Sequence, residues 1–329
     1  MPQPLPSQMH TDKFLTNMSV AFYQEATQFV AGRVFPIIGV QKQSDLYPVF
    51  PKGFFWRNEM GIRPLGGEAK RIGYEVTTDS YRCEEYAIAH TIDDRVRANT
   101  DDPLNPDRSA GRLLTQQALV ALEQNWVTNF FGTSIWGLDR AGDPTPTGDQ
   151  FLHFDDTSSD PIGLIRGDSD LIMSTTGYQP NVLIMGRSVF RYLIVTHADV
   201  IDRIRYVQPG MADAQILASL MNVGQIMVPG SVAESAVEGA TSSIGFIHDN
   251  NSMLLVYSAM NPGIETPSGG YTFAWTGLLP GEMNAIGGVV QRSRLDQAFS
   301  DYFVLRQAYD QKVVASELGI FYSGCLATP

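Results

Sequence analysis

Apolar positions in residues 12–32 recur at three- and four-residue steps, the spacing of one face of an α-helix. Thr11 or Asp12 could cap the start of this helix, and Gly32 could end it. The apolar positions are Phe14, Leu15, Met18, Phe22, Ala26, Phe29 and Val30. The pattern therefore predicts an amphipathic helix that leads into the next segment.

Residues 34–56 are rich in large apolar side chains, but Pro36, Pro48 and Pro51 interrupt them. Proline removes an amide donor and disfavours helical backbone at the preceding residue. We therefore expect an extended arm, which at about 3.3 Å per residue would reach past the body of one domain. The aromatic side chains of such an arm need a covering surface, and a second copy of the chain is the expected supplier.

A long β-hairpin is predicted to project after the arm. Strand-like runs at residues 54–58 and 73–78 flank a charged tip at residues 61–73. Gly66 and Gly67 at this tip favour a turn.

The best-marked helix of the chain is predicted at residues 107–131. Asn105 or Asp107 can cap its start, Pro106 suits its first turn, and Gly132 follows its end. Its apolar stripe consists of Ala110, Leu114, Ala118, Ala121, Leu122, Trp126 and Phe130. At 1.5 Å per residue such a helix is nearly 40 Å long, which is longer than one small domain is wide. We therefore interpret it as a structural spine.

The remainder of the sequence predicts a mixed α/β unit. The predicted fold class of the whole chain is α+β. Residues 137–160 are rich in Gly, Pro, Thr and Asp and are expected to be a loop between units. From Tyr178 onward, short apolar strands alternate with helices. Strand-like runs at residues 285–291, 302–307 and 319–322 are expected to return to the sheet beside the spine helix.

Composition and charge narrow the functional classes. With 329 residues, 43% of them hydrophobic, the chain can bury a substantial core in two packed units. The net charge of −12 argues against a surface that binds phosphate backbones. Cys83 and Cys325 match no metal or redox spacing, so we expect buried, reduced thiols. We recognise neither an export signal nor an apolar run long enough to span a membrane.

Candidate catalytic and metal-binding motifs are weak. The block around Ser169 is similar to the nucleophile block of an esterase class, but an extra residue precedes Leu171 and no Asp-x-x-His block follows to supply a base. The five histidines lack the paired spacing of a zinc site. No glycine loop for binding nucleotide phosphates is recognised. We therefore predict no catalytic residue, no cofactor, no metal site and no enzymatic activity.

Several blocks of the sequence together resemble the major capsid (head) proteins of tailed bacteriophages. The block RVFPIIGVQKQSDLY at residues 33–47 resembles the arm of that family. The block YRCEEYA at residues 81–87, with IDD at 92–94, resembles the strand that enters its spine helix. The block YQPNVLIMGR at residues 178–187, with HADVIDRI at 197–204, resembles its axial domain.

The resemblance implies the division of the chain and its role. Such subunits assemble as hexamers and pentamers into an icosahedral shell around packaged double-stranded DNA, which they enclose without sequence-specific binding. They belong to the virion, which is assembled in the bacterial cytoplasm, and they bind no membrane. The implied parts are an N-terminal helix and arm at 1–53, an extended loop at 54–80, a peripheral domain with the spine helix at 81–177, an axial domain at 178–278 and a return to the peripheral domain at 279–329.

The resemblance also implies partners and contacts. Because only about ten residues precede the first predicted helix, a separate scaffold protein is expected, together with a portal; a decoration protein could be added. The extended loop would lie over a neighbour's peripheral domain through non-covalent contacts, since Lys70 is a cross-link candidate for which we identify no partner Asn. The expected subunit contacts are Phe35, Pro36, Tyr47, Phe54, Phe55, Trp56, Gly66, Gly67, Lys70 and Arg71.

Two alternatives stay open at this point. A bacterial nanocompartment shell would have the same architecture but would enclose an enzyme in place of a genome. A cytoplasmic enzyme with its site in the α/β unit at residues 181–275 is the alternative from a different class.

Overall fold

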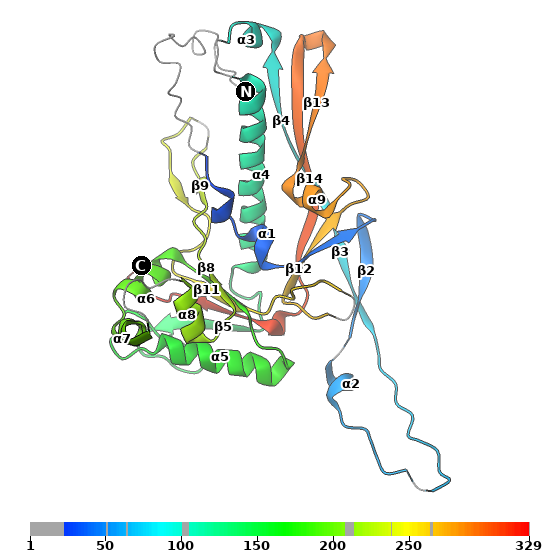
Figure 1. The fold of residues 1–329 in the computed structure, drawn as a ribbon, viewed down its shortest axis with the longest axis vertical. Coiled ribbons are helices and arrows are strands. Elements are labelled where there is room, and N and C mark those ends of the chain that lie inside the picture. Colours follow the sequence, from blue (N-terminus) through cyan, green and yellow to red (C-terminus); the bar gives the residue numbers. More distant parts are fainter. Residues whose placement is uncertain are drawn as a thin grey trace.

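The computed structural model describes residues 23–50, 52–63, 65–100, 105–207, 214–237, 239–263 and 266–328. Helix α4 (Pro106–Phe130) is its longest helix and β14 (Ser300–Val313) its longest strand, and they pack side by side along the long axis (Figure 1). A mixed α/β unit lies at one end of α4, and a long loop projects past this unit (Figure 1).

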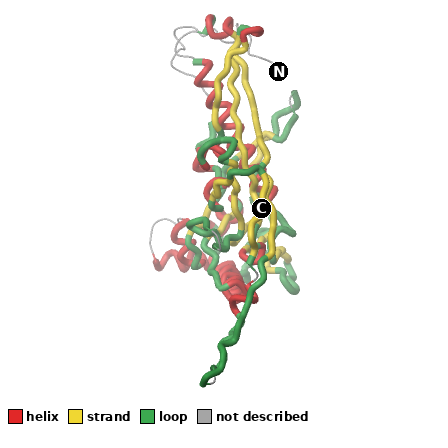
Figure 2. The backbone as a smooth tube through the Cα atoms, turned by 90° about the vertical axis from the view of Figure 1, so that its right-hand side faces the viewer, coloured by secondary structure: helices red, strands yellow, loops and turns green. Residues whose placement is uncertain are grey.

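The long sheet is organised around β14. This strand pairs antiparallel with three others, and a fourth joins the edge in parallel. Helix α4 covers one face of the sheet, whereas the described residues place no helix over the other face of its far half (Figure 2). The other strands of this sheet are β1 (Ile37–Val40), β4 (Glu84–Asp93), β12 (Gly270–Trp275) and β13 (Val289–Leu295).

Helix α4 confirms the predicted spine. The Asn105 side chain accepts a hydrogen bond from the Arg108 amide at 3.1 Å, and proline occupies the first turn, as the capping signals indicated. Its buried stripe is Ala110, Leu114, Ala118, Leu122, Glu123, Trp126 and Phe130. Ala121, expected in this stripe, is only partly buried, and the charged Glu123 is buried beside it.

A second sheet of six strands forms the α/β unit, in the order β6-β5-β15-β11-β7-β8. Its strands are β5 (Leu138–Asp143), β6 (Phe151–Leu152), β7 (Val182–Met185), β8 (Gln225–Met227), β11 (Met253–Val256) and β15 (Gly319–Ser323). Its helices are α5 (Pro161–Thr176), α6 (Arg187–Val195), α7 (Ala198–Val207) and α8 (Ala214–Met221). The unit therefore extends on both sides of the range 178–278 expected for it.

Two expectations about this unit were wrong. Residues 137–160, expected to be a loop, contribute β5 and β6, because β15 offers β5 a parallel partner. Conversely, β15 was expected beside the spine helix, but it pairs with β5 and β11 in the six-stranded sheet. Short strands of this kind have little periodicity of their own, so the pairing partner decides their position.

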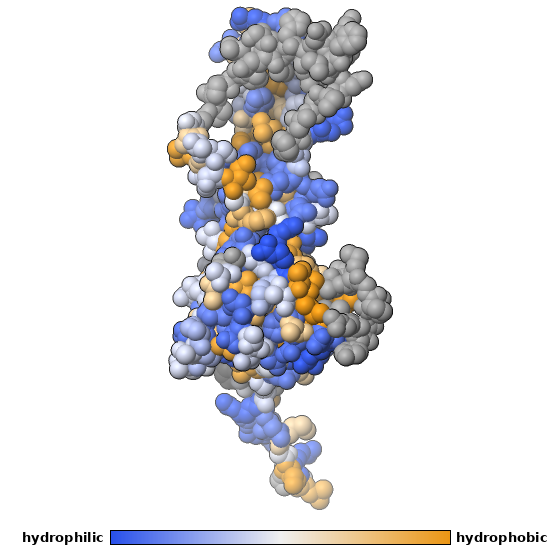
Figure 3. Space-filling model, turned by 90° about the vertical axis from the view of Figure 1, so that its left-hand side faces the viewer, coloured by the Kyte–Doolittle hydropathy of each residue, from blue (hydrophilic) through white to orange (hydrophobic). Residues whose placement is uncertain are grey.

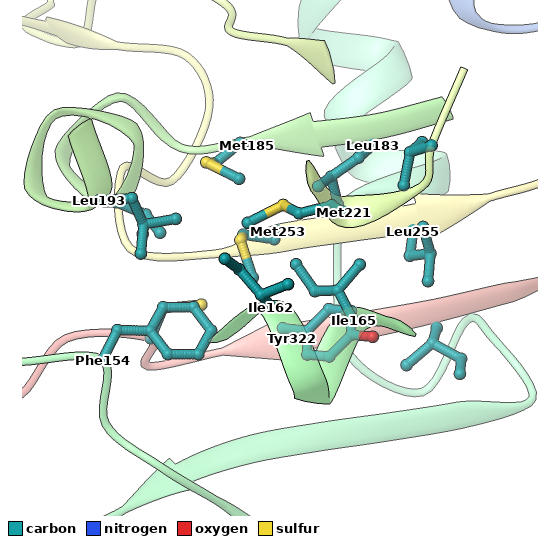
Figure 4. Close-up of a cluster of buried hydrophobic side chains, with 14 of the residues drawn as sticks. Phe154, Ile162, Ile165, Leu183, Met185, Leu193, Met221, Met253, Leu255 and Tyr322 are labelled. Atoms are coloured by element: carbon teal, nitrogen blue, oxygen red, sulfur yellow. The ribbon is translucent and has the colours of Figure 1, made fainter. Parts of the chain in front are cut away.

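The core of the α/β unit consists of closely packed, buried apolar side chains (Figure 4). Strands β7 and β11 are buried at every position, which explains why their sequences are continuously apolar. Ile162 and Ile165 of α5, Leu193 of α6 and Met221 of α8 cover the sheet (Figure 4). The side chain of Tyr322 reaches this core from β15.

The predicted helix at residues 12–32 lies partly outside the described residues. From Tyr23 onward the chain is not one helix: it forms a 3-10 turn η2 (Ala26–Gln28) and a short helix α1 (Ala31–Val34). Hydrogen bonds to distant residues replace helical ones here, because the Gln24 side chain pairs with the backbone of Val232 at 2.7 and 2.8 Å. Tertiary contacts therefore overrode the helical pattern.

The remaining elements are short. A two-stranded hairpin of β9 (Val232–Glu234) and β10 (Ile244–Phe246) lies beside α4. The others are α3 (Asp94–Ala98), α9 (Glu282–Gly287), η3 (Asp296–Ala298) and η4 (Ser316–Leu318). Cys83 and Cys325 are buried free thiols, as predicted. Over the described ranges, no helix is both long and apolar enough to cross a bilayer.

Candidate assembly surfaces

The projecting loop starts from a ladder between β2 (Ser44–Val49) and β3 (Thr77–Arg82), which ends at the pair Val49 and Thr77. Beyond this pair the loop is not the predicted long hairpin. Residues 54–58, expected to be a strand, mostly belong to a short helix α2 (Lys52–Trp56), and residues 73–76 belong to neither a helix nor a strand. Pro51 supplies no amide donor just where the ladder would have to continue.

The far part of the loop exposes large apolar side chains. Ile62 and Leu65 have relative exposures of 101% and 108%, so they touch almost nothing. Orange hydrophobic atoms mark the end of the loop at the bottom of Figure 3. The members of this exposed set are Met60, Ile62, Leu65, Ile72, Tyr74 and Val76. A concentrated apolar set on a protruding segment is typical of an interaction surface.

Polar contacts within the loop hold its tip together. Lys70 pairs with Glu59 and lowers the pKa of that carboxyl through their hydrogen bond. Arg71 lies 3.6 Å from Glu68. Gly66 has a φ of 79°, so the turn predicted at the tip is present and requires the left-handed backbone that glycine tolerates. Gly67 accepts a hydrogen bond from Arg63 through its carbonyl oxygen.

The root of the loop is fastened to the long sheet. The Tyr47 hydroxyl donates to Asp79 at 2.8 Å, and the Lys312 ammonium donates to the same carboxylate at 2.7 Å. Lys312 lowers the pKa of Asp79, and burial raises the pKa of Tyr47. The Tyr47 ring packs on Phe273 with centroids 5.6 Å apart. Tyr47 therefore lies half-buried against its own chain.

The arm does not leave all of its aromatic rings for another copy. Phe35 is 2% exposed and packs 4.5 Å from Phe130, so the expectation that it contacts a second subunit was wrong. Pro36 accepts a hydrogen bond from the Thr272 amide at 3.1 Å, beside the pairing of β1 with β12. Helix α4 covers the Phe35 ring and β12 pairs with the arm, so the chain itself supplies the surface that we assigned to another molecule. The side chains of Phe54 and Phe55 lie outside what the structure describes.

Glu123 joins the arm to the spine, and the sequence analysis missed it. Its carboxylate accepts hydrogen bonds from the amides of Val30 and Ala31 at 2.8 to 3.1 Å, with no exposed surface. His248 lies 3.5 Å away. Burial raises the pKa of Glu123 and lowers that of His248 to about 3. The available signal was spacing, since Glu123 lies three residues before Trp126 on the buried stripe.

The far end of the long sheet carries a cluster of ion pairs. Asp301 lies 2.7 Å from Arg97 and also pairs with Arg292 and Arg294. These guanidinium groups, with the Arg292 hydrogen bond largest, lower the pKa of Asp301 to about 2. The cluster ties α3, β13 and β14 together at the end farthest from the α/β unit (Figure 1).

In the esterase-like block, Asp168 and Ser169 are buried in the α/β unit. Asp168 accepts hydrogen bonds from Arg140 at 2.6 and 2.7 Å and from the Tyr322 hydroxyl at 2.7 Å. Ser169 is buried in α5. His197 lies 3.2 Å from Ser159, on another segment. Within the ranges described above, no group of three or more potential metal ligands occurs.

Comparison with known proteins agrees with this architecture. The chain is 24% identical to the major capsid protein of Burkholderia phage BcepMu over 223 residues, which cover 66% of this chain and 68% of that protein. A phage-related protein of Bordetella bronchiseptica RB50 has 19% identity and a TM-score of 0.67, over 93% of this chain and 95% of that one. The capsid of cyanophage P-SCSP1u has 9% identity and a TM-score of 0.60, over 96% and 93%. The chain has the fold of the tailed-phage major capsid proteins.

This result confirms the fold predicted from the sequence blocks. The capsid fold is shared more widely, because an encapsulin of Synechococcus elongatus PCC 7942 has 12% identity and a TM-score of 0.52, over 96% of this chain and 95% of that one. No protein-family model matches the chain.

Proposed function

We propose that this chain is a major capsid protein that self-assembles, as hexamers and pentamers, into an icosahedral shell around packaged double-stranded DNA. The projecting loop is the observation that carries the proposal. It extends beyond a body with its own core, and the side chains of Met60, Ile62 and Leu65 are almost completely exposed. A structural role, without enzymatic activity, agrees with the phage capsid protein to which the chain is related.

The loop suits head-to-tail contacts between copies. One subunit would supply the loop, including Gly66, Gly67, Lys70 and Arg71, and the next would supply a different receiving surface. Contacts of this type close into rings when the rotation between subunits permits. We place the receiving surface on the uncovered face of β4, β13 and β14, in the proposed peripheral part of the neighbour (Figure 2).

The acidic composition fits an inner wall that encloses DNA without binding it. A net charge of −12 repels phosphate backbones over distances of about a Debye length. The same proposal includes a location in the virion and assembly with a separate scaffold protein and a portal.

The decisive experiment is sedimentation and negative-stain microscopy of the full chain after expression. Megadalton particles of uniform size support the proposal. A compact monomer or a catalytically active dimer at high concentration would contradict it. The content of particles purified from their natural source then separates the two shell classes, because packaged DNA absorbs at 260 nm whereas a nanocompartment would enclose protein.

A further inference from the structure

Lys52, at the start of α2, reaches the end of α5. Its ammonium donates to the Thr175 carbonyl oxygen at 3.0 Å and also pairs with Glu317. Thr175 lies in the last turn of α5, where the unpaired carbonyls give the helix a partial negative charge. Three favourable elements therefore meet at one ammonium: a carbonyl, a carboxylate and a helix C-terminus.

Trp56 completes the same contact from the other end of α2. The Lys52 ammonium lies 5.9 Å from the centre of the Trp56 ring. The ring covers Gly177, the residue that ends α5 with a φ of 74°, and a Cβ added at Gly177 would lie 3.5 Å from it. Trp56 was expected to contact another subunit, yet part of its surface rests on its own α5.

This contact lies where a small rotation has a large effect. The β2–β3 ladder ends at Val49 and Thr77, and among the described residues the ion pairs of residues 57–71 join the loop only to itself. About ten extended residues from root to tip span roughly 30 Å, so a rotation of about 10° moves the tip by about 5 Å. The α2 contact is thus the last tie to the body before the tip.

We propose that Lys52 is a positioning residue, which latches the root of the projecting loop to α5 and so sets the direction of the loop before it meets a neighbour. The biological role of this latch depends on the proposed shell function. Lys52 and Glu317 are 43% and 56% exposed, so the pair is weak enough to open. In the proposed shell, neighbours in rings of six and of five would meet at different angles, and a reversible latch would permit both.

Hydrogen exchange on the unassembled full chain tests the latch directly. In Lys52→Met, amides of residues 53–57 should exchange about tenfold faster, while those of α5 and β3 stay unchanged. Lys70→Met is the matched control, because Lys70 pairs with Glu59 inside the loop. Glu317→Gln should act in the same direction, and adding it to Lys52→Met should have little further effect. Unchanged exchange in Lys52→Met would overturn the latch.

Particle size tests its consequence. Shells of Lys52→Met should have a broader diameter distribution by electron microscopy than shells of the unaltered chain. A distribution that matches the unaltered chain would overturn the role in loop direction. If the unaltered chain forms no shells, the proposed function fails, whereas the exchange result still decides whether the latch exists.

Discussion

Glu123 shows how a single buried carboxylate can direct a segment. Val30 and Ala31 donate to it at the start of α1, where backbone amides lack helical partners. Burying the charge opposes its ionisation, and the raised pKa is the result. An apolar residue would fill this space but would leave two buried amides without acceptors, which costs about 1–3 kcal/mol for each. The carboxylate therefore fixes where the arm enters the body.

Replacing Trp126 tests which face of the spine helix α4 is buried. Trp126 is fully buried and its ring lies 5.7 Å from that of Phe130. Trp126→Ala should lower the free energy of unfolding by about 3 to 5 kcal/mol, because it removes the largest buried side chain and leaves a cavity. Urea unfolding of the unassembled chain measures the loss. Thr128→Ala on the exposed side of α4 is the control, with an expected change within about 0.5 kcal/mol. A loss well under 1 kcal/mol for Trp126→Ala would contradict the assigned face.

His248 predicts a pH dependence. Its pKa in the folded chain, about 3, lies below the ordinary 6.5, because burial between Trp126 and Phe131 disfavours the charged ring. Between these two pH values, His248 therefore binds a proton in the unfolded chain but not in the folded chain. Stability from this group is complete above pH 6.5 and is lost towards pH 3, by up to about 5 kcal/mol. Glu123, with its raised pKa, acts in the opposite direction and reduces the net loss.

The variant His248→Phe isolates this contribution. It removes the titrating ring but keeps an aromatic side chain between the same neighbours. Its unfolding free energy, measured in urea at pH 7, 5.5 and 4, should fall less steeply than that of the unaltered chain. Parallel curves would show that His248 does not titrate on unfolding.

At the scale of elements, the helix α4 was predictable and the loop only in part. Caps and spacing act locally, so Asn105, Pro106 and the apolar stripe sufficed for α4. The loop was recognised from Gly66 and Gly67, but its secondary structure was not, because strand-like residues without a partner strand have no ladder to join. The prediction for Phe35 was wrong because its covering surface includes Phe130, about 95 positions away in the sequence, and no local pattern reveals such a contact.

Deleting residues 62–71 tests the loop as an element. The subunit should remain folded, since the described residues of this range contribute nothing to the buried core clusters. Stable shells should not form, because the deleted part carries the exposed apolar surface. Circular dichroism and thermal unfolding check the fold, and negative-stain microscopy checks assembly. Normal particles from the deletion would exclude the loop as an essential contact.

At the scale of the molecule, the chain is much longer than it is wide (Figures 1 and 2). The sequence blocks predicted this architecture as a whole, because their order along the chain resembles that of one family. They could not predict how β5, β6 and β15 complete one sheet, since those pairings depend on long-range register.

Small-angle scattering of the unassembled subunit tests the shape. A compact domain of 329 residues would have a radius of gyration of about 20 Å. The value for this chain should be clearly larger, and deletion of residues 62–71 should reduce it. A radius near 20 Å for the unaltered chain would mean that the loop folds back on the body in solution.

The side-by-side course of α4 and β14 has a mechanical consequence. Each element runs unbroken from the ion-pair cluster at one end to the neighbourhood of the six-stranded sheet at the other. A force applied at the ion-pair cluster is therefore carried along the covalent backbone and many parallel hydrogen bonds. In the proposed shell, contacts between copies would be made through a slender loop and would be softer than this pair of elements. Pressing on an assembled particle with a fine probe should therefore dislodge whole subunits before it unravels any of them.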